Sequence, residues 1–326
     1  MLEIGSMPKK TITKNLPVVI FCAFLSVLVA GCGHSVINGG RPPIIDDNGA
    51  AFGAPSIAGR IESAEIDESS GLAASKCQDG LLWTHNDSDD GPFLYAIDTA
   101  GRRLGTWKVA GADNRDWEDI ALYKDTSGKC FLLIGEIGNS SERMRSELKI
   151  YRIEEPAVDS GSRRTSRKES ATTLPADVLA FSYPDTPHDA ETLMVHPVTA
   201  DIYVVTKQRE TAAGIYRLKP RFGEVITAER VAELKVPAIP NGFLTGGDIS
   251  PDGKSVAICD YFAGYEFTLP SPGAAFDEVW TQKPHVFSLG DRKQGEAITY
   301  SADGQSVFAT SEGKHQPLFT VKRQQP

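Results

Sequence analysis

Acidic side chains recur at one position of a repeated pattern in this 326-residue sequence. When the repeated segments are aligned, one column is mostly glutamate, and a column two residues earlier is mostly acidic or amide. The first column is Ser70, Glu118, Glu191, Thr245 and Glu296, and the second is Glu68, Asp116, Asp189, Phe243 and Gln294. Carboxylates crowded around a narrow opening repel one another at low dielectric. They must therefore be protonated, paired with Lys207 or Lys314, or neutralised by a cation.

A second polar set stands where the next strand of each repeat is expected to end. It consists of His85, Asn86, Asp87, Glu136, Asn139, Lys207, Asp260, Tyr261, Glu312 and Lys314. In an antiparallel hairpin the end of the second strand returns to the start of the first, so both sets are expected on one rim. An all-oxygen ligand set suits a hard cation, Ca²⁺ first, and the lack of a His/Cys cluster in the sequence argues against zinc.

We expect two groups of site residues on this rim. The metal ligands are predicted to be Glu68, Asp116, Glu118, Asp189, Glu191 and Glu296. The ligand-binding rim is predicted to include Asn86, Asp87, Glu136, Asn139, Asp260, Tyr261 and Glu312. Carboxylates at strand starts can instead accept backbone N–H groups of a neighbouring repeat, which is a structural role. For the six predicted metal ligands both roles remain open.

Other conspicuous residues are expected to be structural. Asp119, Asp252 and Asp303 lie in turns or next to strands, where a carboxylate commonly accepts backbone N–H groups. Trp83 and Trp117 are expected to pack between repeats. The segment 85–91, HNDSDDG, has alternating oxygen ligands but lacks the spacing and closing glutamate of an EF-hand, so an Asx-rich turn is favoured.

Five repeated segments are expected to position these side chains. They cover residues 68–98, 116–153, 189–218, 244–269 and 294–321. Further strands are predicted within 103–110, 177–183, 225–236 and 279–289, and the strand missing from the last repeat is predicted within 55–66. The Asp-Gly pairs at 252–253 and 303–304 suit tight hairpin turns with positive φ. Four antiparallel strands per repeat predict an all-β chain, a single β-propeller closed by an N-terminal strand that joins the last blade. Five blades are expected, and six are possible if residues 119–189 hide a degenerate one.

The N-terminal part is interpreted as a targeting signal. Three lysines precede an apolar run over 16–30, which is shorter than the ~20 residues of a membrane span. The run ends in Val29-Ala30-Gly31-Cys32. This resembles the bacterial lipobox, which implies cleavage after residue 31 and attachment of acyl chains such as palmitate to Cys32. Because Gly33 is not aspartate, the resemblance implies an outer-membrane lipoprotein in a host with two membranes.

Domain boundaries follow from these assignments. Residues 1–31 are predicted to be a lipoprotein signal peptide, 32–54 a flexible tether, and 55–326 the propeller domain. Within the domain, residues 156–175 contain few apolar side chains and are predicted to form an exposed loop. Its basic cluster, which includes Arg163, Arg164 and Arg167, is expected to be solvated, with docking of an anionic partner as the minority interpretation.

Charge and cysteine content limit the function classes. The net charge is −9, and it becomes −11 without the first 31 residues, so nucleic acid is not an expected partner. Cys77, Cys130 and Cys259 remain in the domain, too few for a disulfide scaffold. Cys77 and Cys130 could pair, but free thiols are expected because adjacent blades usually hold such positions too far apart.

Several short motifs together resemble a known family. They are ESSG, NDSDDGP, DWEDIA, GEIGN, DAE and GGDISPDG, spread over residues 60–270. The set resembles bacterial secreted or lipid-anchored β-propellers with TolB-like and WD-like repeats, a group of unsettled function near the esterase-like, phytase-type propellers. One departure concerns GDIGDN, the pattern expected in such proteins. Here Glu136 and Ser140 flank Ile137–Asn139, which weakens any metal site that needs the second aspartate.

Two functions compete at this level. The favoured one is a lipid-anchored binding module of the cell envelope, membrane-attached through Cys32, whose acidic rim takes an envelope protein, a cationic ligand or a sugar. The alternative is a Ca²⁺-dependent phosphoester or ester hydrolase, with His85 and Lys207 as catalytic candidates that stabilise charge or carry a proton. A glycosidase is also conceivable. No G-x-S-x-G motif is present, which disfavours a serine nucleophile, and no nucleotide or organic-cofactor motif is recognised.

Overall fold

The computed structural model describes residues 51–88, 90–140, 144–208, 211–236 and 244–324. The chain divides into two units, Met1–Arg41 and Pro42–Pro326, and every described residue belongs to the second. The predicted signal peptide, Cys32 and the tether up to residue 50 lie outside the described residues. Helical structure in the described part is limited to two 3-10 segments, η1 (Ser162–Arg164) and η2 (Phe276–Thr281). No helix among the described residues is long and apolar enough to cross a membrane.

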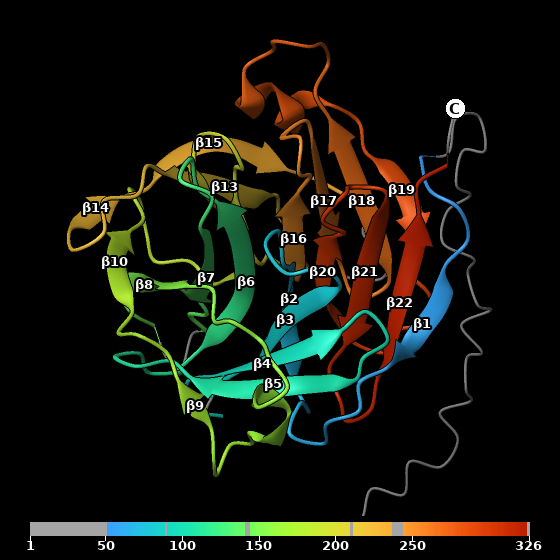
Figure 1. Cartoon of the computed structure of the whole chain (residues 1–326). Coiled ribbons are helices and arrows are strands. Elements are labelled where there is room, and N and C mark those ends of the chain that lie inside the picture. The colour runs from blue at the N-terminus through green and yellow to red at the C-terminus, as the bar shows by residue number, and fades with distance from the viewer. Residues whose placement is uncertain (1–50, 89, 141–143, 209–210, 237–243, 325–326) are drawn as a thin grey trace, which may run out of the picture. The chain divides into compact units, whose positions relative to one another are not determined.

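The strands form five sheets around a common axis, as Figure 1 shows. Blade 1 contains β2 (Ser69–Ala74), β3 (Leu81–Asn86), β4 (Phe93–Asp98) and β5 (Arg103–Lys108). Blade 2 contains β6 (Trp117–Lys124), β7 (Cys130–Glu136), β8 (Leu148–Glu154) and β10 (Asp177–Ser182). Blade 3 contains β11 (Ala190–Val195), β12 (Ile202–Thr206), β13 (Ala213–Leu218) and β15 (Glu229–Leu234). Blade 4 contains β16 (Gly246–Ile249), β17 (Ser255–Cys259), β18 (Ala263–Thr268) and β19 (His285–Ser288). Blade 5 contains β20 (Gly295–Tyr300), β21 (Ser306–Ser311), β22 (Pro317–Lys322) and β1 (Ser56–Arg60).

The ring closes through the two ends of the domain, which confirms the predicted all-β, five-bladed propeller. Strand β1 pairs with β22 in antiparallel register, with Ser56 opposite Thr320 and Ile57 opposite Phe319. The innermost strands β2, β6, β11, β16 and β20 contact one another in sequence around the axis, and β20 contacts β2. Closure of this kind leaves only short strand edges exposed to solvent.

Apolar side chains hold neighbouring blades together. Five clusters of buried apolar residues are found in the described part of the chain, and each lies between two adjacent blades. Between blades 1 and 2, Trp83 meets Trp107 edge-on with ring centroids 5.1 Å apart, and Trp117 packs in the same cluster. Both Trp83 and Trp117 are fully buried, which confirms that they pack between repeats.

The two repeated hairpin turns also form as predicted. Gly253 and Gly304 each adopt a φ of 70°, which suits glycine in a tight turn. The Asp252 and Asp303 carboxylates accept hydrogen bonds within these same turns, from the backbone N–H groups of Lys254 and Gln305. Their predicted structural role is therefore confirmed, although the donors lie in their own turn and not in a neighbouring blade.

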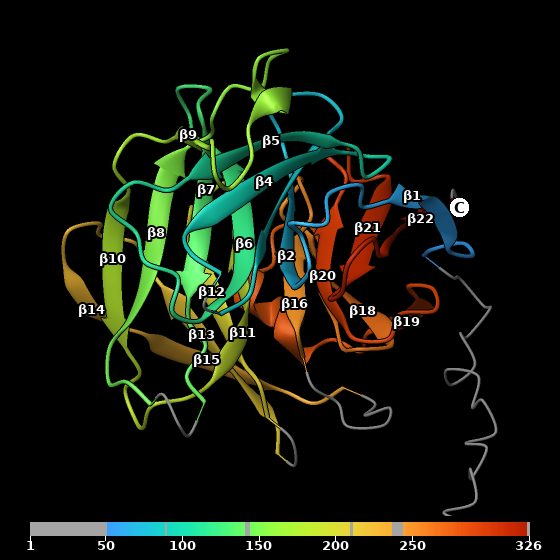
Figure 2. The same ribbon diagram turned by 90° about the horizontal axis from the view of Figure 1, so that it is seen from below.

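Two extra strands widen blades 1 and 2. The short strand β9 (Ala171–Thr172) pairs in parallel with β5, and β14 (Val225–Thr227) pairs in parallel with β10. Figures 1 and 2 place β9 and the 3-10 turn before it along β5. Residues 156–175 lie at the surface, as predicted, but they pack against blade 1. The predicted surface position is thus confirmed. The prediction of a plain loop is wrong, because the segment contains the parallel strand β9 and is held by several side-chain hydrogen bonds.

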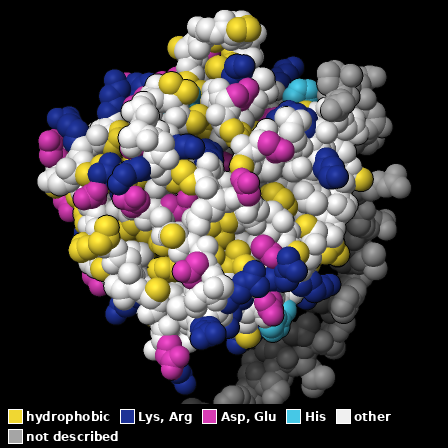
Figure 3. Space-filling model, viewed as in Figure 1, with side chains coloured by type: hydrophobic (Ala, Val, Ile, Leu, Met, Phe, Trp, Pro, Cys, Tyr) yellow, Lys and Arg dark blue, Asp and Glu magenta, His cyan; other side chains and the backbone are white. Residues whose placement is uncertain are grey.

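Basic and acidic side chains lie next to each other on the face drawn in Figure 3. The described residues visible there therefore present mixed charge and no continuous area of one sign.

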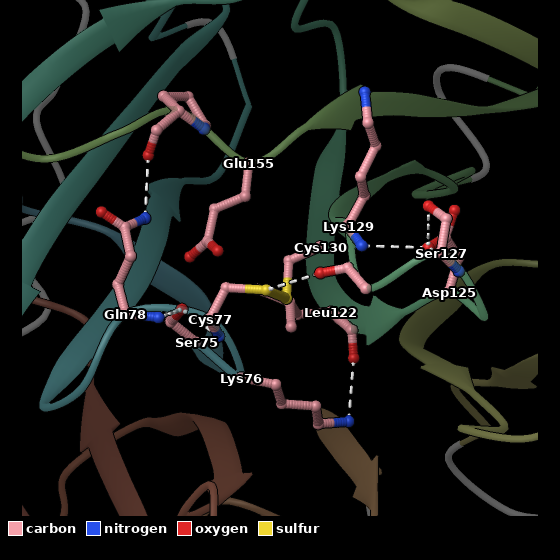
Figure 4. The surroundings of a disulfide bond; sticks show 12 residues. Ser75, Lys76, Cys77, Gln78, Leu122, Asp125, Ser127, Lys129, Cys130 and Glu155 are labelled. Atoms are coloured by element: carbon pink, nitrogen blue, oxygen red, sulfur yellow. Dashed lines mark hydrogen bonds between the residues drawn. A yellow bond between two sulfur atoms is a disulfide. The ribbon is translucent and has the colours of Figure 1, made fainter.

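Cys77 and Cys130 form a disulfide that joins blades 1 and 2 (Figure 4). The expectation of free thiols is wrong at this pair. Cys77 lies in the loop between β2 and β3, and Cys130 begins β7. Because both positions follow innermost strands, which converge near the axis, their Cα atoms are only 6.1 Å apart, within disulfide reach. Cys259 is a buried free thiol.

Loss of this disulfide should destabilise the domain. The Cys77→Ser/Cys130→Ser variant should lose about 2–5 kcal/mol of unfolding free energy, since the cross-link restricts the unfolded chain. Urea unfolding of the wild type with and without reductant measures the effect, and reductant should not change the double variant. A thiol assay in denaturant without reductant should detect Cys259 alone among the three domain cysteines, and additional reactive thiols would contradict the assignment.

Candidate functional site

A β-bulge brings the glutamates of the first column to the propeller axis. The pairing register shifts between Ser69 and Gly71, between Trp117 and Asp119, between Ala190 and Thr192, and between Gly295 and Ile298. The bulges thus coincide with Ser70, Glu118, Glu191 and Glu296. A bulge interrupts the period-two alternation of a strand and redirects side chains. Side chains therefore do not alternate strictly here, since Glu118 lies near carboxylates of other blades and the Asp119 carboxylate bonds to blades 3 and 4.

Blade 4 departs from this arrangement. The pairing of β16 with β17 contains no register shift. The Thr245 hydroxyl donates a hydrogen bond to the Gly295 carbonyl oxygen at 2.8 Å and is thus directed at blade 5. Thr245 is therefore a blade-to-blade contact.

Three buried glutamates from blades 2, 3 and 5 form one electrostatic cluster at the axis. Glu118, Glu191 and Glu296 are each less than a tenth exposed. Burial, followed by repulsion from Glu191, raises the pKa of Glu118 well above its ordinary value. Burial and the same neighbour also raise the pKa of Glu296 well above its ordinary value. The predicted convergence of these carboxylates from different repeats is thus seen in the fold.

Three carboxylates of blades 1 and 2 come close enough to share one cation. Asp87, Asp116 and Glu118 each place an oxygen atom so that all three lie within 4.8 Å of one another. The backbone of Gly138 lies against this group, because a Cβ added there would stand 2.1 Å from Glu118 Oε1 and 2.6 Å from Asp116 Cγ. Burial is the main cause that raises the pKa of Asp87 to about 7. This cluster, called the acidic triad below, has the donor chemistry of a hard cation site.

An unpaired hydroxyl lies in the equivalent position of blade 1. Ser70 occupies the bulge of β2, where Glu118 occupies the bulge of β6, and its residue is 1% exposed. Its Oγ makes no hydrogen bond to the described residues. A buried hydroxyl without a partner is costly, so this atom is a further oxygen suited to a bound ion or ligand.

Lys207 lies on the blade 3 side of the rim. Its ammonium group donates to Glu191 Oε1 in an ion pair and lies 5.8 Å from the centre of the Tyr261 ring. Burial lowers the pKa of Lys207, but the Glu191 carboxylate outweighs it, so the pKa lies above its ordinary value. Burial raises the pKa of Glu191 to about 7 despite the lysine. The rim therefore contains a protein-supplied cation on the side opposite to blade 1.

Glu312 follows β21 on the blade 5 side of the rim. The Gln294 side-chain amide donates to Glu312 Oε2 at 2.5 Å and to Glu296 Oε1 at 3.5 Å. A hydrogen bond and repulsion from Glu312 add to the raised pKa of Glu296. Two carboxyl groups and one amide thus lie together at blade 5, where Lys207 acts on Glu296 and Glu312 adds repulsion at Asp87 of blade 1.

Several predicted rim residues are held in backbone networks. Asn86 Oδ1 accepts from the N–H groups of Asp67 and Glu68, both at 3.2 Å. Asp260 Oδ1 accepts from Phe262 and Ala263 N–H groups, and its Oδ2 accepts from the Tyr265 hydroxyl. These contacts make Asn86 and Asp260 turn-forming residues behind the rim.

Glu136 and Asn139 order the loop after β7. Glu136 Oε1 accepts from Arg145 Nη1 at 2.5 Å, and Oε2 accepts from the Arg115 N–H at 2.9 Å. Asn139 donates its backbone N–H to Asp189 Oδ1 at 2.6 Å. Asp189 is partly exposed at the rim, whereas Glu68 is exposed. Of the six predicted metal ligands, Asp116 and Glu118 belong to the acidic triad, which Asp87 of the other group completes.

His85 is closed off from solvent. It is fully buried between blades 1 and 2, edge-on to Trp117 with ring centroids 5.6 Å apart. Burial is the main cause that lowers its pKa to about 4, so the imidazole is neutral at pH 7. Nδ1 lies 2.9 Å from the Asn86 carbonyl oxygen. Its contacts are those of a packing residue.

Asp119 has the structural role that the sequence predicts. Its carboxylate accepts from the N–H groups of Ile120 at 2.8 Å, Leu193 at 2.9 Å and Gly247 at 3.4 Å. It thereby joins blades 2, 3 and 4. Gly138 was not predicted as a site residue, because its approach to Asp116 and Glu118 depends on how the loop after β7 packs against the start of β6.

Comparisons with known proteins give the following result. No family model matches the chain, and no curated protein matches it by sequence. Among solved structures, a luciferin-regenerating enzyme resembles it with a TM-score of 0.46 and 9% sequence identity. That match covers 82% of this chain and 95% of the other.

The raised pKa of Asp87 predicts a specific pH dependence. In the folded state the carboxyl stays protonated up to about pH 7, whereas in the unfolded chain it ionises near its ordinary value of 3.8. The folded state thus binds more protons in this window, and stability falls as pH rises. In chelator, Asp87→Asn should therefore raise Tm relative to wild type at about pH 7.5 but not at about pH 4.

Asp303→Asn is the matched control, since hydrogen bonds from Ser301 lower the pKa of Asp303. The Tm of that variant should lie below the wild-type value at neutral pH and equal it in acid. An equal response of both variants to pH would contradict the assignment.

Proposed function

We propose that this chain is a lipid-anchored β-propeller of the bacterial cell envelope that binds Ca²⁺ at its central rim and, with it, an extracytoplasmic ligand. The acidic triad is the observation that carries the proposal, because three carboxylates from two blades place oxygen atoms within 4.8 Å of one another. Such crowding is costly in a buried site and is relieved by a cation at the centre.

The donor set favours Ca²⁺ over other cations. The triad offers carboxylate oxygens alone, and Ca²⁺ accepts six to eight oxygen ligands in flexible geometry. Asp87, Asp116 and Glu118 would bind the ion, with Ser70 Oγ as an additional oxygen of the same bulge position. Bound Ca²⁺ would supply positive charge and open coordination positions for oxygen atoms of a ligand.

The proposed location rests on two independent features. The apolar run before Cys32 has the length of a secretory signal, and its end resembles a lipobox. The Cys77–Cys130 disulfide is of the kind that forms and persists outside the cytoplasm. An outer-membrane lipoprotein of the TolB-like propeller type is consistent with both.

Hydrolysis of an ester or phosphoester is the second candidate function. Lys207 favours it, since an ammonium group next to carboxyl groups of raised pKa is typical of catalytic sites. In that case the triad would hold Ca²⁺ against substrate oxygens, and Lys207 would stabilise developing charge. Binding remains the favoured function, because His85, the candidate proton carrier, is fully buried against Trp117 and has no access to solvent.

Thermal melting tests the cation site. The protein, first treated with EDTA, should gain about 2.7 kcal/mol of stability when Ca²⁺ reaches a hundred times its Kd. The Asp116→Asn/Glu118→Gln variant should lose this gain because two of the three triad carboxylates are removed.

The matched control is Asp252→Asn/Asp303→Asn, which removes two carboxylates from turns and should keep the gain. If Ca²⁺ does not change the Tm of the wild type, the proposal of a cation site is wrong. If the triad variant keeps the Ca²⁺-dependent shift, the cation site lies at other residues.

Membrane attachment is tested separately. The full chain expressed in a Gram-negative bacterium should partition into the detergent phase, whereas Cys32→Ser should remain uncleaved at residue 31 and carry no acyl chain. Metabolic labelling with a palmitate analogue and the mass of the N-terminal peptide measure both effects. Label incorporated into the Cys32→Ser protein would contradict the lipobox assignment.

A further inference from the structure

Residues 156–175 connect two strands of blade 2, yet they run along blade 1. The Thr165 carbonyl oxygen accepts a hydrogen bond from Arg103 Nη1 at 2.8 Å, and Thr165 Oγ1 accepts from the Thr106 N–H at 2.7 Å. Strand β9 then pairs with β5. The segment therefore has a fixed path that delivers Arg167 to blade 1.

Arg167 enters the base of the loop that contains Asp87. Its Nη1 forms an ion pair with Asp90 Oδ1 at 2.5 Å, and its Nε donates to the Tyr95 hydroxyl at 2.6 Å. Its Nη2 also donates to the Glu65 carbonyl oxygen and lies 3.3 Å from Asp67 Oδ1. One guanidinium group thus contacts the chain before β2, the loop after β3 and the middle of β4.

The contacts continue from Arg167 to the acidic triad. Asp90 Oδ2 accepts from Tyr95 Oη at 2.9 Å and from Asn86 Nδ2 at 3.0 Å. Asn86 is the neighbour of Asp87, whose backbone N–H donates to the Glu68 carbonyl oxygen at 3.0 Å. The path from Arg167 to Asp87 therefore consists of two hydrogen-bonded side chains and one peptide unit.

From these contacts we infer that Arg167 is a positioning residue that holds the Asp87 loop in register with Asp116 and Glu118 for cation binding. The inference rests on the proposed Ca²⁺ site. Arginine suits this role because its planar fork bonds several acceptors at once, which lysine cannot do. Residues 156–175, whose basic cluster is expected from the sequence to be solvated, would then have a role in the site.

The direction in which cation affinity changes when Arg167 is removed distinguishes a positioning role from a purely electrostatic one. Removing a positive charge near a cation site should strengthen cation binding by Coulomb's law alone. Loss of positioning should weaken it, since outer residues that orient metal ligands contribute about 10–100-fold to metal affinity. Arg167→Ala is therefore expected to weaken binding although it makes the site more negative.

The test uses the full chain purified in detergent, with Tb³⁺ as a luminescent substitute for Ca²⁺. Trp117, which stands between Asp116 and Glu118 in sequence, serves as the light-absorbing sensitiser. The Tb³⁺ Kd of Arg167→Ala should rise by about 10–100-fold over wild type. Arg167→Lys keeps the charge and loses the fork, and its Kd should fall between the two. It also serves as the informative variant if Arg167→Ala does not fold.

Arg164→Ala is the matched control, because Arg164 is an exposed arginine of the same segment. Its Kd should equal that of the wild type. Arg167 variants that bind Tb³⁺ as tightly as wild type, or more tightly, would overturn the inference and leave the Ca²⁺ site in place. A wild type that binds neither Tb³⁺ nor Ca²⁺ would overturn the proposed function, and the positioning role with it.

Discussion

The carboxylate of Asp119 is the interaction on which the centre of the propeller depends. It accepts backbone N–H groups from its own strand and from the innermost strands of the next two blades. Burial raises its pKa well above the ordinary value, and the three donors act in the opposite direction. A hydrogen-bonded carboxylate at this position fixes the spacing of three inner strands, and with it the positions of the side chains just above.

The bulges next to Asp119 determine what the rim contains. One extra residue in β6 allows two consecutive side chains, Glu118 and Asp119, to face other blades. The same device in blades 3 and 5 adds Glu191 and Glu296. Burial and mutual repulsion raise the pKa values of these glutamates. The site thus combines unfavourable electrostatics with a rigid scaffold, a combination that natural proteins keep where function requires it.

The repulsion among the rim carboxylates is offset differently on the two sides of the rim. On the blade 3 side, the Lys207 ammonium group pairs with Glu191. On the other side, Asp87, Asp116 and Glu118 place carboxylate oxygens within 4.8 Å of one another. With the proposed Ca²⁺ bound, a ligand at this rim would meet a metal ion on one side and an ammonium group on the other, an arrangement useful both for binding oxygen-rich molecules and for ester chemistry.

The sequence alone determined the architecture and the chemical type of the site. Repeated strands with Asp-Gly turns predicted five blades and the closing strand, because a strand's alternation and turn residues are local properties. The same alignment predicted that carboxylates such as Glu118 and Glu191 meet on one rim. Only the tertiary structure decided which of them lie together, because bulges, the 6.1 Å approach of Cys77 to Cys130, and the path of Arg167 across blade 1 depend on packing between blades. Distances between repeats are set by the ring, and no spacing along the chain encodes them.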